Sequence, residues 1–363
     1  MISLIGKSII FTDTHIGRKN FSVEKTNKTL SYMQKTIDDN NISNIFFLGD
    51  FFDNRKQISW DIFNIVVEFF ENNKDKNIIF IVGNHDIFYK NRIDINSLKF
   101  LDKMFENITV LEKSTIVKFN DKNLLFIPWL VDEQDKNRPD EIMIQSSDLI
   151  LGHFEFINFA LLPGVMSSHG DTPDVYKGKK ILSGHYHVSS TKNNVHYLGT
   201  CEQMNWSDYN EIKGCNILNE DLSLDFIENL DTDLYLKIYF DSSKKDDTKI
   251  CVTGTKESLY FDNVNTMLQH DVFKHKNNIK IYVKDKSDKT SFTSFFITLD
   301  MNHIEYVVID ITPEMENLVN NNHEVGDSKE SLNDILLKML DGDDESKRIF
   351  TEIYTEALVI SEM

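Results

Sequence analysis

Short apolar runs recur along the first half of the chain, and each is followed at once by a polar segment. Five of them stand out, at residues 9–11, 45–48, 78–82, 149–151 and 181–182. Runs of this length, bounded by turn-forming residues, are typical of buried strands. Three other stretches, 24–40, 59–72 and 95–105, space their apolar residues as helices do, and Ser59 is a candidate N-cap of the second. This alternation predicts an α/β fold over residues 1–230.

The pattern changes after residues 229–233, which we take as a boundary. Residues 234–240 alternate in polarity as a strand does, and 280–284 and 305–309 are further strand candidates. The polar stretch 316–327 resembles a linker, and helical spacing returns at 331–340 and 346–360. The chain is therefore expected to contain three parts: residues 1–230, a small α+β module at 231–315, and a helical hairpin at 328–363.

The five polar segments carry the candidate chemistry. They are Asp13-Thr14-His15, Gly49-Asp50-Phe51-Phe52-Asp53, Gly83-Asn84-His85-Asp86, Gly152-His153 and Gly184-His185-Tyr186-His187. Their carboxylate, amide and imidazole groups are ligands of divalent Mn, Fe, Zn or Mg. Since each follows a strand, they would meet at the carboxyl ends of the strands, where α/β sheets place their active sites. One such motif alone would be an ordinary turn, but five in this context predict a metal site.

The spacing within the motifs limits what each side chain does. A pair of dications needs a bridging carboxylate, and Asp50, between the first and third motifs, suits that role. Asp13 and His15 alternate along an extended segment, so both face one metal only if the chain bends there. His185 and His187 have the same spacing and can reach neighbouring metals.

The third and fourth motifs supply the remaining candidates. Asn84 offers an amide oxygen and His153 a further imidazole. His85, next to Asn84, would point in another direction, which makes it a candidate acid rather than a ligand.

The order and spacing of these motifs resemble the calcineurin-like metallophosphoesterases. Residues 196–200 and 211–214 are similar to the strand, the Gly-Ser/Thr turn and the Lys-Gly segment of the SbcD-type double-strand-break repair nucleases, whose phage branch is the recombination endonuclease subunits. The resemblance covers residues 6–230. It implies a two-sheet α/β sandwich flanked by helices, then a capping, DNA-binding α+β domain at 231–315 and a partner-binding helical hairpin at 328–363.

The resemblance also implies roles for individual residues. Two divalent metals are expected, manganese first and magnesium as the alternative. One would be held by Asp13, His15, Asp50 and His187, and the other by Asp50, Asn84, His153 and His185. His85 corresponds to the histidine that contacts the scissile phosphate and assists the leaving oxygen, and Asp86 to a carboxylate that orients His85.

Some residues near the motifs depart from the pattern or add to it. Cellular members commonly have a histidine where this chain has Asp53, which leaves the balance between exonuclease and endonuclease activity open. Arg18 and Arg55 follow ligand motifs and are candidate phosphate contacts. Trp60, Trp129 and Trp206 are expected to pack in the interior rather than to stack on bases.

Composition and charge bear on partners and location. The net charge is −19, of which residues 301–363 carry −11, so tight binding to DNA by the chain alone is not expected. The resemblance implies an SbcC-type coiled-coil ATPase held by residues 328–363, and a homodimer formed through helices 59–72 and 95–105. The three scattered cysteines give no disulfide framework, no apolar run spans a membrane, and no secretory signal is visible. We expect a cytoplasmic protein of a bacterial cell, encoded by the cell or by a phage.

Three functions compete on these grounds. The first is a Mn-dependent DNA nuclease with 3′–5′ exonuclease and single-strand endonuclease activity, acting in DNA repair, recombination or replication. A small-molecule phosphodiesterase or protein phosphatase on the same fold is the enzyme alternative, and about 130 further residues after residue 230 count against it. A metal-free scaffold is the third, but every ligand position is filled.

Overall fold

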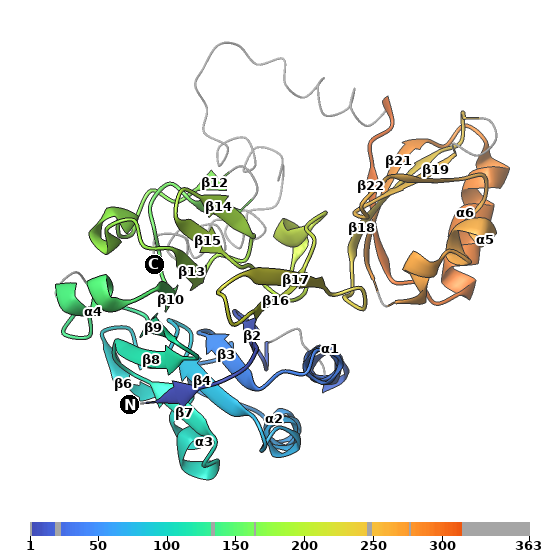
Figure 1. Ribbon diagram of the computed structural model, residues 1–363. Coiled ribbons are helices and arrows are strands. Elements are labelled where there is room, and N and C mark those ends of the chain that lie inside the picture. Colours follow the sequence, from blue (N-terminus) through green and yellow to red (C-terminus); the bar gives the residue numbers. More distant parts are fainter. Residues whose placement is uncertain are drawn as a thin grey trace, which may run out of the picture. The chain divides into compact units, whose positions relative to one another are not determined.

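The computed structural model describes residues 2–18, 23–131, 135–162, 165–244, 249–275 and 277–313 (Figure 1). The expected linker at 316–327 and hairpin at 328–363 lie outside these residues. Residues 1–309 form one compact unit, and the expected boundaries at 230, 315 and 328 stay predictions.

A six-stranded sheet holds three of the five predicted strands. Its order is β17-β16-β2-β3-β4-β7, in which β2, β3, β4 and β7 are parallel and β16 is antiparallel to both of its neighbours, β2 and β17. The strands are β2 (Ser8–Phe11), β3 (Asn44–Leu48), β4 (Asn77–Ile81), β7 (Ile108–Leu111), β16 (Gly214–Leu218) and β17 (Leu224–Glu228).

A seven-stranded sheet holds the other two. Its order is β1-β8-β9-β10-β13-β15-β14, and β9, β10, β13 and β15 run parallel. The strands are β1 (Ser3–Leu4), β8 (Thr115–Phe119), β9 (Lys122–Ile127), β10 (Leu149–His153), β13 (Ile181–Gly184), β14 (Ser190–Lys192) and β15 (Val195–Tyr197).

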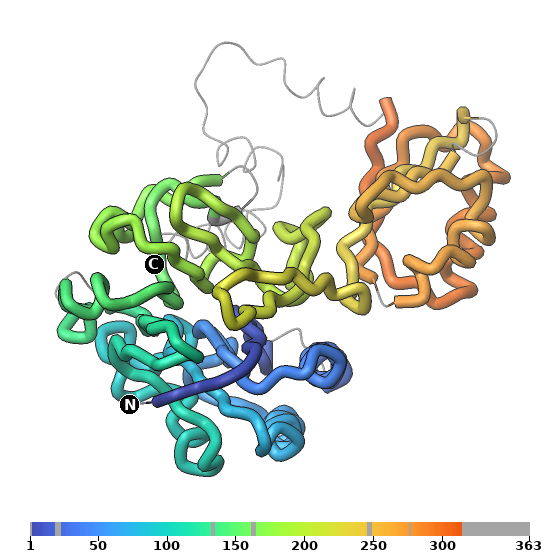
Figure 2. The backbone as a smooth tube through the Cα atoms, in the orientation of Figure 1, coloured from blue at the N-terminus to red at the C-terminus, as the bar shows by residue number. Residues whose placement is uncertain are grey.

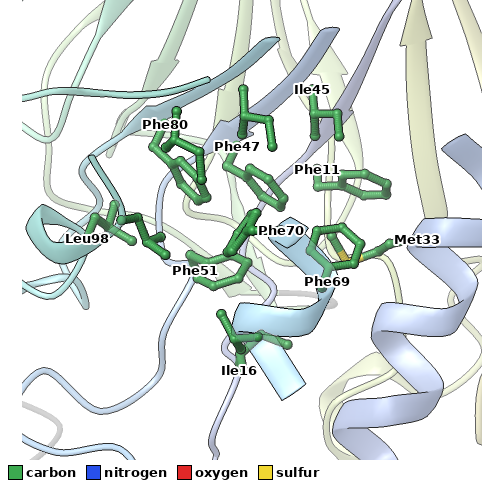
Figure 3. Packing of buried hydrophobic residues seen from close by; sticks show 14 of the residues in the cluster. Phe11, Ile16, Met33, Ile45, Phe47, Phe51, Phe69, Phe70, Phe80 and Leu98 are labelled. Atoms are coloured by element: carbon green, nitrogen blue, oxygen red, sulfur yellow. The ribbon is translucent and has the colours of Figure 1, made fainter. Parts of the chain in front are cut away.

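The two sheets share a core. Residues of both, such as Phe46 and Ile79 from the first and Phe126 and Leu151 from the second, form one buried cluster. The outer face of the six-stranded sheet packs on the helices through a second cluster rich in phenylalanine, where Phe47 and Phe80 stack with ring centroids 4.4 Å apart (Figure 3). A third cluster covers the outer face of the seven-stranded sheet. The expected two-sheet α/β sandwich is confirmed.

The helices match the predictions in part. They are α1 (Val23–Asp39), α2 (Trp60–Asn72), α3 (Lys99–Met104) and α4 (Glu141–Ser146). Ser59 is at the N-cap of α2, but its side chain makes no capping hydrogen bond. The prediction of a helix over 95–105 is wrong in its first part, because strand β6 (Arg92–Asn96) pairs with β5 (Ile87–Tyr89) there. The predicted range included the last two residues of this strand, and the helix that follows it, α3, is only six residues long.

The apolar surface expected to form a dimer is used inside the protomer. Of the five apolar residues expected there, Val66, Phe70, Leu98 and Leu101 are completely buried between the six-stranded sheet and the helices, and Phe63 is half-buried. Trp60, expected to be buried, is 77% exposed and contacts Phe63 edge-on. The amphipathic spacing of α2 is explained by its packing on the sheet, so the spacing does not by itself indicate a dimer.

The third sheet has five strands and a separate core. Its order is β20-β19-β18-β21-β22, and Figure 2 shows helices α5 and α6 lying along one side of it. The elements are β18 (Tyr235–Asp241), β19 (Ile250–Thr253), β20 (Leu259–Phe261), α5 (Val264–Leu268), β21 (Asn278–Asp285), α6 (Lys289–Met301) and β22 (Tyr306–Asp310). The strands predicted at 234–240, 280–284 and 305–309 are present.

Short elements complete the described chain. A hairpin joins β11 (Ala160–Leu162) to β12 (Val165–Met166), and the 3₁₀ helices are η1 (Pro173–Tyr176), η2 (Trp206–Asp208) and η4 (Asp271–Lys274). All three cysteines are free. No helix in the described ranges combines the length and apolarity that crossing a membrane requires.

Candidate metal centre

The carboxyl ends of five strands from both sheets bring the seven expected ligands together. One group of donor atoms comes from Asp13, His15 and His187, after β2 and β13. A second comes from Asp50, His153 and His185, after β3, at the end of β10 and after β13. Within each group all donor atoms lie within 4.8 Å of one another. These are the two groups that the family resemblance divided between two metals.

Asp50 and Asn84 connect the groups. The Oδ2 atom of Asp50 lies 3.3 Å from His153 Nε2 and 3.9 Å from His15 Nε2, so one carboxylate faces an imidazole of each group. The Oδ1 atom of Asn84 lies 3.0 Å from His153 Nε2 and 3.1 Å from His185 Nδ1. Asp50 is thus placed as a bridge must be, and Asn84 belongs with the second group.

Left-handed backbone explains how neighbouring residues reach the same group. Asp13, His15, Asp50 and His185 have φ values of 50°, 45°, 51° and 90°. Non-glycine residues adopt this region at a cost of roughly 1–3 kcal/mol each when the surroundings enforce it. The bend that Asp13 and His15 needed is therefore built from two left-handed residues. Both carboxylate oxygens of Asp13 also accept hydrogen bonds, each 3.0 Å long, from the backbone N–H of His185.

In His153 and His15, Nδ1 faces an oxygen atom, which leaves Nε2 as the nitrogen that can bind a metal. His153 Nδ1 lies 2.7 Å from the carbonyl oxygen of Leu48, and a carbonyl only accepts, so Nδ1 carries a proton. His15 Nδ1 lies 3.2 Å from a carboxylate oxygen of Asp53. In both rings Nε2, the atom facing the other donors, is left to coordinate, as is usual for metal-binding histidines. The residues therefore fit divalent metals.

The charges of the site favour a cation beside Asp50. Burial would raise the pKa of Asp50, but the charges of His153 and His15 hold it well below its usual value. Burial acts to lower the pKa of His153, yet Asp50 and Asp13 raise it to about 9. Burial, aided by the charge on His153, lowers the pKa of His185 to about 3. Asp50 therefore stays charged although it is buried, as a carboxylate that ligates a metal must be.

Asp86 contacts backbone groups of two loops and not the His85 ring that the resemblance implied. It is fully buried, and burial together with the charge of Asp50 raises its pKa to about 7. Its carboxylate accepts from the backbone N–H groups of Asp50, Phe52 and Gly83 and from the hydroxyl of Ser97. The expectation that it orients the His85 ring is wrong, because that ring places Nδ1 3.2 Å from the carbonyl oxygen of Asp53. Asp86 instead fixes the loops after β3 and β4.

His85 lines a cleft of about 1110 Å³. Its ring meets that of His15 edge-on, with centroids 4.8 Å apart. Three cations, Arg55, Lys56 and Lys90, line the same cleft. Burial acts to raise the pKa of Asp53, but its contact with His15, and then the charges of His85 and of half-buried Arg18, lower it. The cleft therefore joins a candidate acid to basic side chains.

Two supporting residues were not anticipated from the sequence as parts of the site. The Trp129 ring lies 5.1 Å from that of His185, so this tryptophan packs on a ligand. The buried Lys213 donates to the carbonyl oxygen of His187 and to the carboxylate of Asp208, both at 2.8 Å. The Lys-Gly segment that contains Lys213 was visible in the sequence, but only the fold shows that it supports a ligand.

Close approach of the strand ends explains the glycine before Asn84. A Cβ atom on Gly83 would lie 2.2 Å from Asp50 Oδ1 and 2.4 Å from the Asp50 backbone nitrogen. We predict that Gly83→Ala displaces Asp50, lowers stability by about 1–3 kcal/mol and reduces bound metal. Thermal unfolding and metal analysis measure both effects.

Gly178→Ala is the control for this prediction. Gly178 has a φ of +73° but open space around its Cβ position, so the substitution should cost about 1 kcal/mol through backbone strain and leave metal content unchanged. Equal metal content in Gly83→Ala and the wild type would contradict the close-approach argument.

Comparison with known proteins agrees with this geometry. Residues 6–189 match the family model of the calcineurin-like phosphoesterases, and the chain belongs to this family. It is therefore a phosphoesterase of a class that works with divalent metals, as the motifs indicated.

One relative is similar over much of the chain. Exonuclease subunit 1 of Enterobacteria phage T4 is 30% identical over 248 residues, which cover 65% of this chain and 71% of the relative. Two solved structures are more distant. Nuclease MPE of Pseudomonas putida is 17% identical, covering 59% of this chain and 84% of its own, with a TM-score of 0.28. GAP50, the anchor in the inner membrane complex of Plasmodium, is 12% identical, covering 80% and 94%, with a TM-score of 0.32. Scores this low support no conclusion, so the family assignment comes from the sequence match.

Proposed function

We propose that this phosphoesterase is a Mn-dependent DNA nuclease that combines 3′–5′ exonuclease and single-strand endonuclease activity. The observation that carries the proposal is the cleft in which His85 lies with Arg55, Lys56 and Lys90. Cations beside a phosphoester-cleaving site favour a polyanionic substrate, because they neutralise neighbouring phosphates. The similarity to a phage protein named exonuclease subunit 1 points to the same substrate class.

In this proposal the two groups of ligands would hold two divalent ions, for which manganese is the first candidate and magnesium the second. Asp13, His15, Asp50 and His187 would hold the first ion, and Asp50, Asn84, His153 and His185 would hold the second. Bound ions supply an activated water and stabilise the attacking and leaving oxygens.

Protein groups position the substrate and move the proton. His85 donates a proton to the leaving oxygen, and the Asp53 carbonyl 3.2 Å from its Nδ1 fixes the direction of the ring. Arg55 binds a phosphate in the cleft, and Arg18 stays a candidate for the same role. Asp53 also contacts His15, where a family histidine would have no carboxylate to offer. The balance between exonuclease and endonuclease action is what the digestion panel below measures.

A digestion panel tests the proposal. Single-stranded, blunt duplex and hairpin DNA are incubated with Mn²⁺ beside a simple phosphodiester and a phosphopeptide, with a chelator as the control. We expect Mn-dependent cleavage of single-stranded DNA and no release of phosphate from the peptide. Turnover of the simple diester or the phosphopeptide without DNA cleavage would establish the small-molecule or phosphatase alternative, and no turnover of any substrate would favour the scaffold.

We also propose that the chain works as a homodimer and as the nuclease subunit of a repair or recombination complex with an SbcC-type ATPase. The acidic balance of the chain, −19, is unfavourable for holding duplex DNA alone. Residues 331–340 and 346–360 space their apolar residues as two amphipathic helices, a form that docks on coiled coils. Exposed Trp60 is a candidate contact for the dimer.

Deleting residues 328–363 separates cleavage from assembly. We predict that the shortened protein still cleaves short single strands with Mn²⁺, because every candidate ligand lies before residue 188. It should lose ATPase binding and the ATP-stimulated degradation of duplex DNA. Copurification with the ATPase measures the first loss, and replacement of residues 316–327 by a Gly/Ser linker of equal length is the control. Full binding by the shortened chain would show that the hairpin is not the docking element.

A further inference from the structure

One face of the five-stranded sheet is covered by α5 and α6, and the other is contacted only in part, by residues 206–209. Residues that alternate along β18 and β21, among them Ile238, Phe240, Ile281 and Val283, are buried in the core with α5 and α6. The intervening residues of both strands point to the opposite face. Figure 2 shows the two helices on one side of this sheet. We call the opposite side the open face.

Tyrosines form a row across the open face. Tyr239 of β18 is paired in register with Tyr282 of β21 on one side and with Cys251 of β19 on the other, and Cys251 is paired with Tyr260 of β20. The rings of Tyr239 and Tyr282 stack, with centroids 5.1 Å apart and planes at 23°. Tyr260 is 57% exposed, and the other two tyrosines are half-buried. Four neighbouring strands thus present a flat aromatic surface with a small residue between its rings.

Lysines flank this row. Lys284 places Nζ 4.7 Å from the Tyr239 ring. Lys237 and Lys280 are paired in register two residues before the stacked tyrosines. Lys237 Nζ lies 3.9 Å from the ring centre of Tyr209, just after η2, and Lys280 Nζ lies 4.0 Å from that of Trp206, within η2.

Two carboxylates, Asp241 and Asp285, are paired in register at the ends of β18 and β21. Asp241 Oδ1 accepts hydrogen bonds from the backbone and side chain of Ser243, at 3.1 and 2.6 Å. Lys237, Lys280 and Lys284 outnumber these two carboxylates, so this end of the sheet is locally basic on a chain whose net charge is −19.

We propose that the open face binds single-stranded nucleic acid, with bases stacked on Tyr239, Tyr282 and Tyr260 and phosphates beside the lysines. Stacking on a flat sheet requires unpaired bases, which is why aromatic residues on sheets select single strands over duplexes. The strand is taken to be DNA because the inference rests on the proposed nuclease function. The face would hold the substrate at a place separate from the cleft that contains His85.

Binding without cleavage tests the proposal. The full-length protein, in a chelator that removes metals, is titrated into a labelled oligothymidylate, and fluorescence anisotropy gives the dissociation constant. A strand of the same length that lacks bases carries the same phosphates and should bind at least about tenfold more weakly. The double variant Tyr239→Ala, Tyr282→Ala should lose about 10- to 100-fold in affinity for the oligothymidylate.

Matched variants separate stacking from folding and from charge. Tyr239→Phe with Tyr282→Phe keeps both rings and should bind as the wild type does, so a loss seen only in the alanine variant is a loss of stacking. Lys284→Glu should weaken binding and lower its salt dependence. Lys74→Glu, at an exposed ion pair with Glu71 after α2, should change neither.

The outcomes also distinguish this inference from the proposed function. Unchanged affinity in the double alanine variant, or equal affinity for the strand without bases, would overturn the inference even if the protein cleaves DNA with Mn²⁺. Tyrosine-dependent binding by a protein that cleaves no DNA would leave the open face as a nucleic-acid site and remove the nuclease function.

Discussion

Asp50→Asn is expected to remove both metal ions and to reduce Mn-dependent hydrolysis by about 10⁴-fold. Asp50 faces His153 of one ligand group and His15 of the other, at 3.3 and 3.9 Å, so its charge serves both. Losing only a partner that orients a ligand costs 10- to 100-fold in affinity or activity, and a shared ligand should cost more. Metal analysis of the purified variant and initial rates on single-stranded DNA measure the two effects.

The control for this prediction is Asp39→Asn, at an exposed carboxylate paired with Lys35 on α1. It removes one negative charge without touching the site, and metal content and rate should not change. Two bound metals and near-normal turnover in Asp50→Asn would show that the ligand assignment is wrong.

His85→Asn is expected to keep both metals and to lose between 10² and 10⁴ in rate, the usual contribution of a positioned acid. The ring lies in the cleft and is oriented through Asp53, while the seven proposed ligands are other residues. Single-turnover rates on a short oligonucleotide, beside metal content, separate chemistry from binding. His169→Asn, at an imidazole whose Nδ1 contacts Ser168, is the control and should leave both unchanged.

Loss of metal in proportion to the loss of rate would make His85 a ligand. That outcome is a real alternative, because His85, His15 and Asp53 have donor atoms within 4.8 Å of one another.

The sequence predicted where the strands end and which side chains follow them. Each run of buried residues is short, and a polar motif comes directly after it, so the convergence of Asp13, Asp50, Asn84, His153 and His185 followed from the fold class alone. The two-sheet arrangement came from the family resemblance, because strand pairing between residues far apart in sequence is not written in local periodicity.

Other features depended on tertiary contacts that no local pattern reveals. The left-handed backbone of Asp13 and His15 is enforced by neighbours from β3 and β13, not by residue type. Asp86 lies next to His85 in the chain, yet its carboxylate binds the backbone of two loops. The stretch 95–105 was assigned to a helix, but its first two residues belong to β6, whose pairing with β5 is a tertiary contact.

The same limit affects the interpretation of apolar surface. Val66 and Leu101 have the spacing of an exposed docking stripe, and both are fully buried against the six-stranded sheet. A helix that packs on a sheet and a helix that packs on a partner have the same pattern. Only burial in the folded chain distinguishes them.

The central claim is that five strand ends build one centre for two metal ions. Crystals soaked in Mn²⁺ and measured at the manganese absorption edge test it most directly, through the anomalous difference map. The account predicts two peaks, one against Asp13, His15 and His187 and the other against Asn84, His153 and His185, with Asp50 contacting both. A single peak, or peaks away from these side chains, would contradict it.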